Sequence, residues 1–376
     1  MSEYRFPWAQ PTLHGREEEF VVDAIRSTWL SGGAYVDRLE SETVQLLGGS
    51  HQVVSVNNGT AALQLALLAL DIGSGDEVIV PDFSFIAAAS MVLAVGAQPV
   101  FADVDPETWL LDPRSVESAV SSRTRAVVAV HLFGNVCAMP ELAAVAEHHG
   151  VALVEDCAEA FMSRRSGQAV GTFGDVGTFS FQATKTIASG EGGLVSIRDT
   201  PLADRDRVLR NHGMAPGRRY WHDLPGFNFR LTNLQAAVAC AQLLELETIV
   251  TTRKRIHSEY VDHLSGHDAV RFQAIDTSID LVPWAMPLRL GGEGSWWPFA
   301  KRDALIAALG ERGIETRPGF YPATSMPPYA GGSSATPNSA AVAASAISLP
   351  MYLELTTEDV RVICENLVDC IDEVEA

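Results

Sequence analysis

Short apolar segments alternate with helical segments through roughly the first 200 residues, and this alternation constrains the fold more than any other feature. The strand candidates lie at residues 77–80, 99–102, 126–130, 151–154, 177–181 and 193–197. Helix candidates lie between them, at 61–70, 86–95 and 140–149. Strands that are apolar on both faces are typical of parallel sheets covered by helices on both sides. We therefore expect an α/β fold with a mostly parallel sheet between helices.

The second half of the chain has a different pattern. A long helix is predicted from Asn233 to about Leu264, where it would lead into a second, smaller α/β domain. Strands are expected at 284–290 and 314–316, helices at 301–312 and 357–374, and loops at 291–295 and 330–339. Thr356 or Thr357 would cap the last helix. A chain of 376 residues is long for one core, which favours two domains.

Composition narrows the class of protein. The net charge of -20, from 27 basic and 47 acidic residues, disfavours binding to nucleic acid or to an anionic membrane surface. No run of eighteen apolar residues is present, and the first residues lack the basic-then-apolar layout of a secretory signal. Five cysteines without regular spacing argue against a disulfide framework. We expect a cytoplasmic protein.

A lysine follows one of the strand candidates in an unusual setting. Lys185 comes after the apolar run 177–181 and before the glycine-rich segment 190–193, among small residues. A second unusual charge, Asp156, lies at the end of another strand candidate, the apolar run 151–154. A lysine and an acid at the ends of buried strands indicate an amine catalyst and a partner for a cationic ring.

Other segments complete the outline of a cofactor site. The segment 57–63, Asn-Asn-Gly-Thr-Ala-Ala-Leu, opens a helix with free amides and a hydroxyl, which suits a phosphate. Ser180 offers a second hydroxyl, and an aromatic residue in the segment 81–87 could stack on a planar ring in the sheet crevice. Asp156 would pair with a protonated pyridine nitrogen, and Lys185 would bond to an aldehyde. Together these features predict a pyridoxal 5′-phosphate (PLP) site, with no metal ion.

At these residues the chain resembles the DegT/DnrJ/StrS family of sugar aminotransferases, within the fold-type-I PLP enzymes. The likeness runs from about Phe6 to Leu355, and its matching segments are 58–63, 75–79, 130–134, 155–160, 180–185, 190–193, 226–230 and 317–322. The resemblance implies a large PLP-binding domain at residues 12–245 and a small C-terminal domain at 246–376. It also implies a homodimer with shared active sites.

The resemblance assigns roles by position. Lys185 is implied as the lysine that bonds to the cofactor and transfers protons, and Asp156 as the partner of the ring nitrogen. Phe85 takes the place of the stacking aromatic residue. Asn228 matches an asparagine that reaches the phosphate of the neighbouring subunit. The resemblance implies that a set of small residues binds the phosphate: Gly59, Thr60, Ala61 and Ser180.

Two residues depart from the family pattern. Glu159 stands where many members have glutamine beside the phenolic oxygen of the ring, and Gln182 stands where histidine is frequent. An ionised carboxylate would repel a phenolate, so Glu159 is either protonated or points elsewhere. We hypothesise that Glu159 raises the pKa of the imine that Lys185 forms with the cofactor.

The resemblance implies transfer of an amino group from L-glutamate, which leaves as 2-oxoglutarate, to a keto-sugar attached to a nucleoside diphosphate. The segment 314–322 favours position 4 of a 4-keto-6-deoxyhexose. Arg317 and Tyr321 are candidate sugar contacts or residues of a domain interface, and Arg218 and Arg219 are candidates for binding the diphosphate or a solvated loop. His131 is a candidate for lining the substrate site.

Four alternatives belong to other reactions or classes. The first is aminotransfer at position 3 or to a keto-cyclitol. A sugar dehydratase of the same family is disfavoured by Lys185, because that branch carries histidine there. A non-catalytic regulatory protein is disfavoured by the absence of a basic patch in the sequence. A Rossmann dehydrogenase is disfavoured because no Gly-x-Gly-x-x-Gly turn follows the early strands.

Overall fold

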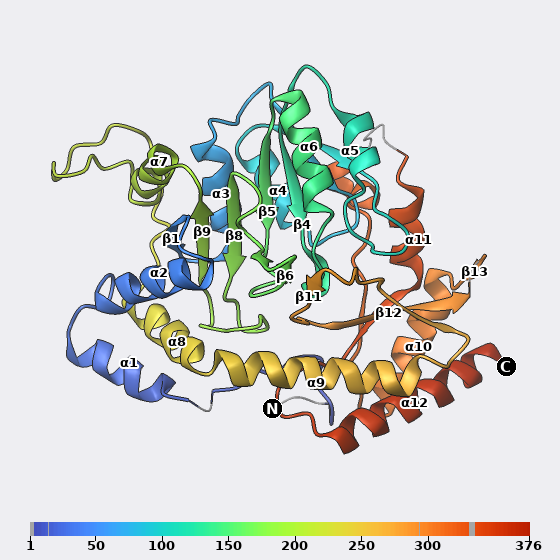
Figure 1. Cartoon of the computed structure of the whole chain (residues 1–376). Helices are drawn as coiled ribbons and strands as arrows, with labels where there is room; N and C mark the ends of the chain where they lie inside the picture. Colours follow the sequence, from blue (N-terminus) through green and yellow to red (C-terminus); the bar gives the residue numbers. More distant parts are fainter. Residues whose placement is uncertain (1–3, 14, 293, 331–334) are drawn as a thin grey trace.

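The structure, a computed structural model, describes residues 4–13, 15–292, 294–330 and 335–376. Its largest sheet has seven strands and helices on both sides (Figure 1). In sheet order the strands are β1 (Gln52–Val56), β9 (Gly193–Ile197), β8 (Val176–Ser180), β5 (Ala152–Asp156), β4 (Thr124–Val130), β2 (Glu77–Pro81) and β3 (Gln98–Ala102). Only the pairs that β9 makes, with β1 and β8, are antiparallel. The predicted mostly parallel α/β sheet is confirmed.

The helices of this part follow the chain between the strands. They are α1 (Glu17–Arg26), α2 (Ala34–Leu46), α3 (Gly59–Ala69), α4 (Ala87–Ala94), α5 (Pro113–Ala119), α6 (Met139–His149), α7 (Thr200–Arg210) and α8 (Asn233–Leu244). Helix α3 is apolar almost all round and packs on strands β8 and β9, because it lies in the core between the sheet and neighbouring helices. The helices predicted at 61–70, 86–95 and 140–149 correspond to α3, α4 and α6.

The helix predicted from Asn233 to about Leu264 is two helices. Helix α8 ends at Leu244, and α9 (Leu246–Leu264) continues after a bend of 66°. Helix α8 packs against α1 and α2, whereas α9 packs along α12 (Thr357–Glu375), so the chain turns at Glu245 to serve two different sets of neighbours. In the described part of the chain no single helix is long and apolar enough to cross a membrane. The bent pair of α8 and α9 would be so by length and composition only.

The C-terminal part contains a second sheet, of five strands. They are β10 (Val270–Phe272), β12 (Met286–Gly292), β15 (Ala346–Leu349), β14 (Arg317–Pro318) and β13 (Ser295–Trp296), and all of their pairings are antiparallel. Its helices are α10 (Phe299–Glu311), α11 (Pro337–Ser345) and α12, with 3₁₀ turns at 323–325 and 327–329. A small third sheet joins β11 (Ile279–Asp280), β6 (Arg164–Arg165) and β7 (Gln168–Ala169).

Three local predictions for this part differ from the structure. The strand predicted at 314–316 begins three residues later, as β14, because Ile314 pairs instead with Phe6 in an isolated bridge. The loop predicted at 291–295 is partly a hairpin, in which Gly292 pairs with Ser295; Glu293 lies outside the described residues. The loop predicted at 330–339 gives way to α11 at Pro337, and its residues 331–334 lie outside the description.

Buried apolar residues form two clusters. The larger one surrounds the seven-stranded sheet, and the smaller one lies among α9, α10, α12 and the five-stranded sheet. Helix α12 begins as predicted with Thr356, whose hydroxyl accepts the N–H of Asp359 in a capping box. All five cysteines are buried and free, so no disulfide framework is present. The domain boundary near residue 245 stays a prediction.

Candidate active site

The predicted cofactor residues meet at one edge of the large sheet. Strands β1, β8, β5, β4 and β2 run in the same direction, so their carboxyl ends lie together. The residues that follow these ends are Asn57–Thr60, Phe181–Lys185, Asp156–Glu159, His131–Gly134 and Asp82–Phe85. The alternation of strands and helices thus places segments that are far apart in the chain around one site.

Lys185 lies in a short turn after β8. Its backbone N–H donates to the carbonyl of Gln182, at 2.8 Å, and its side chain is 15% exposed. The Nζ atom is 3.7 Å from Oε1 of Glu159 and 3.9 Å from the centre of the Trp284 ring. Trp284 also donates its indole N–H to the carbonyl of Thr184, at 2.8 Å. The amine is therefore held between a carboxylate and an aromatic face.

Asp156 is the last residue of β5, and its carboxyl group is buried. Burial raises its pKa, while the N–H of Ala158, which donates to Oδ1 at 3.0 Å, and the charge of Lys185 act in the opposite direction. Among the described residues nothing donates a hydrogen bond to Oδ2. A buried carboxylate with a free oxygen is suited to a cationic N–H partner.

Glu159 points into the same site. Burial raises its pKa to about 7, and the Lys185 charge and the N–H of Phe133, which donates to Oε2 at 3.0 Å, oppose that shift. The prediction left open whether this side chain faces the site or points elsewhere. The structure turns Oε1 toward Lys185, so this carboxyl group faces the amine across the site.

The start of α3 forms a cradle with Ser180. Asn58 caps the helix by accepting the N–H of Ala61, at 2.8 Å, which leaves the N–H groups of Gly59 and Thr60 at the positive end of the helix dipole. A Cβ on Gly59 would lie 2.7 Å from Cβ of Ser180, so only glycine permits this approach. Gly59 and Ser180 thus lie in contact, and Thr60 follows Gly59 as an exposed residue in the first turn of the helix. The N–H of Ala61 is occupied by the cap instead.

Aromatic side chains line the region beyond the lysine. Phe85 is 58% exposed, as expected of a residue that stacks on a ligand rather than in the core. Its ring centre is 6.3 Å from that of Phe320. Phe133 stacks between Phe320 and Trp284, at 5.6 Å and 6.3 Å, and its backbone has a positive φ of 62°. This aromatic row joins the two parts of the chain across the site.

His131 does not line the substrate side of the site, which corrects that prediction. Its side chain is fully buried, with Nε2 3.1 Å from Oε2 of Glu155 and Nδ1 accepting the N–H of Cys137. Glu155 also accepts backbone N–H groups from Gly171, Phe173 and Gly174. Successive strand residues face opposite sides, so Glu155 points away from the side that Asp156 serves. His131 therefore packs with Glu155 on the face of the sheet opposite to Asp156.

The other proposed substrate residues are exposed but have intramolecular contacts. The Arg317 guanidinium lies 4.2 Å from the Trp8 ring, and Tyr321 stacks on Phe299 and accepts a hydrogen bond from Arg302. Arg218 and Arg219 lie on the segment between α7 and α8, which projects from the body of the chain (Figure 1). The exposed residue Asn228 lies on the same segment. Asn228 forms a bridge with Asn211 at the base of this segment, and the carbonyl of the next residue, Phe229, accepts the N–H of Asn57 at 2.9 Å. Among the described residues no hydrogen bond or ion pair joins Arg218, Arg219 or Asn228 to Lys185.

Sequence reasoning missed three residues of the site, Trp284, Phe133 and Phe320. Trp284 was assigned only to a strand and the other two only to matching segments, because none carries a charge or a hydroxyl. The one signal was a tryptophan at the start of a predicted strand, which is common in cores. Their role depends on packing between distant parts of the chain.

The residues fit pyridoxal phosphate. The cradle of Gly59, Thr60 and Ser180 suits its phosphate, the free oxygen of Asp156 suits its pyridinium, and Lys185 is within the same pocket as Glu159. An α/β fold with this site at the carboxyl ends of its strands defines a fold-type-I PLP-dependent enzyme.

Comparisons with known proteins give the particular family. The model of the DegT/DnrJ/EryC1/StrS aminotransferase family matches residues 11–368, and the chain belongs to this family. The GDP-perosamine synthase of Escherichia coli O157:H7 is 37% identical over 362 residues, which cover 96% of this chain and 97% of that protein. The UDP-N-acetyl-3-dehydro-alpha-D-glucosamine 3-aminotransferase of Acidithiobacillus ferrooxidans is 45% identical over 231 residues, covering 61% of this chain and 62% of the other.

A solved structure agrees with this assignment. The PLP form of Spr1654 from Streptococcus pneumoniae superposes with a TM-score of 0.93 at 26% identity, over 99% of this chain and 100% of that one. The same protein is known in a form with the aminated cofactor, PMP. The protein is thus a PLP-dependent aminotransferase.

Proposed function

We propose that this aminotransferase moves the amino group of L-glutamate to a nucleotide-linked keto-deoxysugar, at position 4 of a 4-keto-6-deoxyhexose. The observation that carries the proposal is the similarity to a GDP-perosamine synthase along 96% of the chain. The intact pair of Lys185 and Asp156 supports catalysis rather than a regulatory role. The lysine also disfavours the dehydratase reaction.

The residues of the site have distinct tasks in this reaction. Pyridoxal phosphate, when bound, supplies an electron-withdrawing ring that stabilises negative charge next to the transferred nitrogen. Asp156 would hold a proton on the ring nitrogen, because a buried carboxylate with an open oxygen favours a cationic N–H partner. Lys185 Nζ accepts and returns the proton at the amino-bearing carbon in each half of the reaction. Glu159, 3.7 Å away, holds the charge on Nζ when the amine is protonated.

The site is open in a single chain, which supports a homodimer. Thr60 and Phe85 are exposed, and the segment between α7 and α8, which carries Arg218 and Arg219, projects into solvent, with Asn228 exposed and bridged to Asn211 at its base. We infer that this segment reaches the active site of a partner, where Asn228 would contact the cofactor phosphate and the two arginines the diphosphate of the sugar nucleotide. In such a dimer the arginines of the partner's segment would add positive charge for an anionic ligand in an otherwise acidic protein.

A second candidate is aminotransfer at position 3. The identity of 45% with a 3-aminotransferase of a UDP-sugar, although over 61% of this chain, favours it specifically. Transfer to a keto-cyclitol without a nucleotide is the remaining candidate.

One experiment separates these candidates. The PLP-loaded enzyme is given L-glutamate and a panel of nucleotide keto-sugars with the ketone at position 3 or 4, and the product is identified by mass and NMR. The proposal requires a 4-amino-6-deoxyhexose nucleotide and 2-oxoglutarate in equal amounts. Amination only at position 3 would refute it. Activity on a keto-cyclitol that free nucleoside diphosphate does not inhibit would also refute it.

A further inference from the structure

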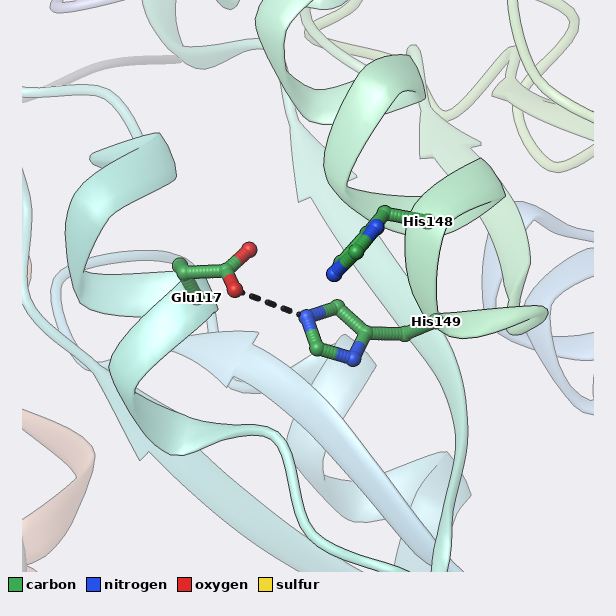
Figure 2. A group of neighbouring side chains, drawn as sticks. All are labelled: Glu117, His148 and His149. Atoms are coloured by element: carbon green, nitrogen blue, oxygen red, sulfur yellow. Dashed lines mark hydrogen bonds and ion pairs between the residues drawn. The ribbon is translucent and has the colours of Figure 1, made fainter.

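A cluster of two histidines and a glutamate lies on the surface formed by α5 and α6. Glu117 projects from α5, and His148 and His149 form the end of α6 (Figure 2). One ligand atom from each residue lies within 4.8 Å of the other two. The His149 Nε2 atom is 2.8 Å from Oε1 of Glu117, and the two histidine rings are 4.7 Å apart. The proposed aminotransfer uses none of these residues.

The donor set and its spacing match a transition metal. Two imidazoles and a carboxylate are a known ligand set for Zn²⁺, with water as the fourth ligand. Bonds of about 2.0–2.2 Å in a tetrahedron place ligand atoms about 3.3 Å apart. The present separation of 2.8 Å between Glu117 and His149 needs to open only slightly, and both side chains are exposed enough to move. Figure 2 shows the His148 ring directed toward the Glu117 and His149 side chains.

Electrostatics at this position favour a cation. The two histidines occupy the last turn of α6, an eleven-residue helix, where the helix dipole is negative. The whole chain carries a net charge of -20, which raises the local concentration of cations. A divalent ion would replace the hydrogen bond between His149 and Glu117 and would tie α5 to α6.

The other cluster of similar composition does not offer a metal site. His131, Glu155 and Cys157 are fully buried, and their ligand atoms are already engaged. Glu155 accepts three backbone N–H groups and faces His131, whose second nitrogen accepts the N–H of Cys137. The surface cluster differs because its three residues are exposed and, among the described residues, a single hydrogen bond, between Glu117 and His149, engages its ligand atoms.

We propose that Glu117, His148 and His149 form a Zn²⁺ site that is separate from the active site. It lies beside the first residues of β5, whereas Asp156 ends the same strand, about 13 Å away along five extended residues. Helix α6 runs back from the catalytic edge of the sheet to the opposite edge, which explains this separation. Metal binding here therefore stabilises the α5–α6 contact without entering the aminotransfer chemistry.

Zinc titration of the metal-stripped, PLP-loaded full-length protein tests the proposal. We expect one Zn²⁺ per chain at neutral pH, measured by calorimetry or by competition with a chromophoric chelator. His148→Ala, His149→Ala and Glu117→Gln should each weaken binding by at least about 10-fold. His263→Ala is the matched control, because His263 is an exposed histidine on α9 outside the cluster. It should bind zinc as the wild type does.

A spectroscopic measurement identifies the ligands. Cu²⁺ bound to the wild type should show coupling to two imidazole nitrogens in its EPR spectrum, and to one in each single histidine variant. Zinc should also raise the thermal unfolding midpoint of the wild type and leave that of the His148→Ala/His149→Ala double variant unchanged. The proposal is overturned if the wild type binds no Zn²⁺, or if the double variant binds it with wild-type affinity.

Discussion

Lys185 and Glu159 face one another across the active site, with Nζ 3.7 Å from Oε1 in a buried setting. The lysine must be neutral to attack a carbonyl and charged after it accepts a proton. Burial raises the pKa of the facing Glu159 carboxyl group to about 7, so the charge of this group changes near neutral pH. The pairing thus gives the lysine a neighbour whose charge changes near physiological pH.

The titration of the bound cofactor should report this neighbour. The ionised form of Glu159 stabilises a protonated nitrogen at the position of Nζ, so Glu159→Gln should move the midpoint of the pH-dependent visible absorbance to lower pH. A shift of about 1 pH unit is expected, which corresponds to one charge interaction of about 1.4 kcal/mol. Superimposable titration curves for the wild type and the variant would contradict this role.

Removing the amine itself should stop the reaction. Lys185→Ala loses both the bond to the cofactor aldehyde and the proton transfer, and turnover should fall by at least about 10²–10⁴-fold. The visible absorbance of the lysine-bound cofactor should disappear. Lys254→Ala is the control, because Lys254 is exposed on α9 and pairs with Asp280. Wild-type turnover in the Lys185 variant would refute the assignment.

The sequence predicted the parts of this site that depend on order along the chain. Strand ends in a parallel sheet meet at one edge, so Asp156, Ser180 and Lys185 could be placed together from the alternation alone. The bend at Glu245 could not be predicted, because no proline or glycine marks it and only the packing of α8 and α9 on different neighbours requires it. Trp284 could not be assigned to the site from the sequence either, because its place beside Lys185 also depends on packing between distant parts of the chain.

His131 shows the limit of placing a side chain from a strand end. The residue follows the end of β4 as predicted, but its ring turns toward Glu155. That buried carboxyl group is held by hydrogen bonds with His131 and with the N–H groups of residues 171, 173 and 174. The zinc ligands were equally hidden, since the adjacent histidines gave no indication that Glu117, some thirty residues earlier, lies beside them.

The buried Glu155 should be important for stability rather than for chemistry. Glu155→Ala would leave the N–H groups of Gly171, Phe173 and Gly174 without an acceptor, at a cost of about 3–5 kcal/mol of unfolding free energy. Glu155→Gln keeps an acceptor oxygen and should lose less. Denaturant unfolding measures both, with Glu365→Ala, an exposed residue of α12, as the control. Equal stability of the wild type and Glu155→Ala would show that the loop finds other partners.

The arginines of the projecting segment should affect binding of the nucleotide sugar. Charge reversal at both positions, Arg218→Glu with Arg219→Glu, should raise the KM for the nucleotide sugar by about 10-fold or more and leave the KM for glutamate unchanged. The matched control reverses two arginines elsewhere, Arg114 and Arg361, which gives the same net charge. An equal rise of KM in both double variants would attribute the effect to net charge alone.

Asp206, in α7, should make stability depend on pH in a way that has nothing to do with catalysis. Both of its carboxyl oxygens are buried and have no hydrogen-bond partner within the described part of the chain, and burial raises its pKa to about 7 against the charges of Arg210 and Arg207. In the unfolded chain the group titrates near 3.8. Between these values the folded state holds a proton that the unfolded state has released, so its contribution to stability is full below about pH 4 and is lost as the pH rises through 7.

Asp206→Asn removes that dependence because the amide stays neutral at every pH. The variant should match the wild type at and below about pH 4, gain on it steadily between pH 4 and pH 7, and exceed it by about 1–4 kcal/mol of unfolding free energy at pH 8. Glu159 titrates in the same range in both proteins, so the difference between their pH profiles isolates Asp206. Denaturant unfolding at several pH values measures that difference. A constant difference from pH 5 to pH 8 would mean that Asp206 is ionised throughout, with Arg210 as its effective partner.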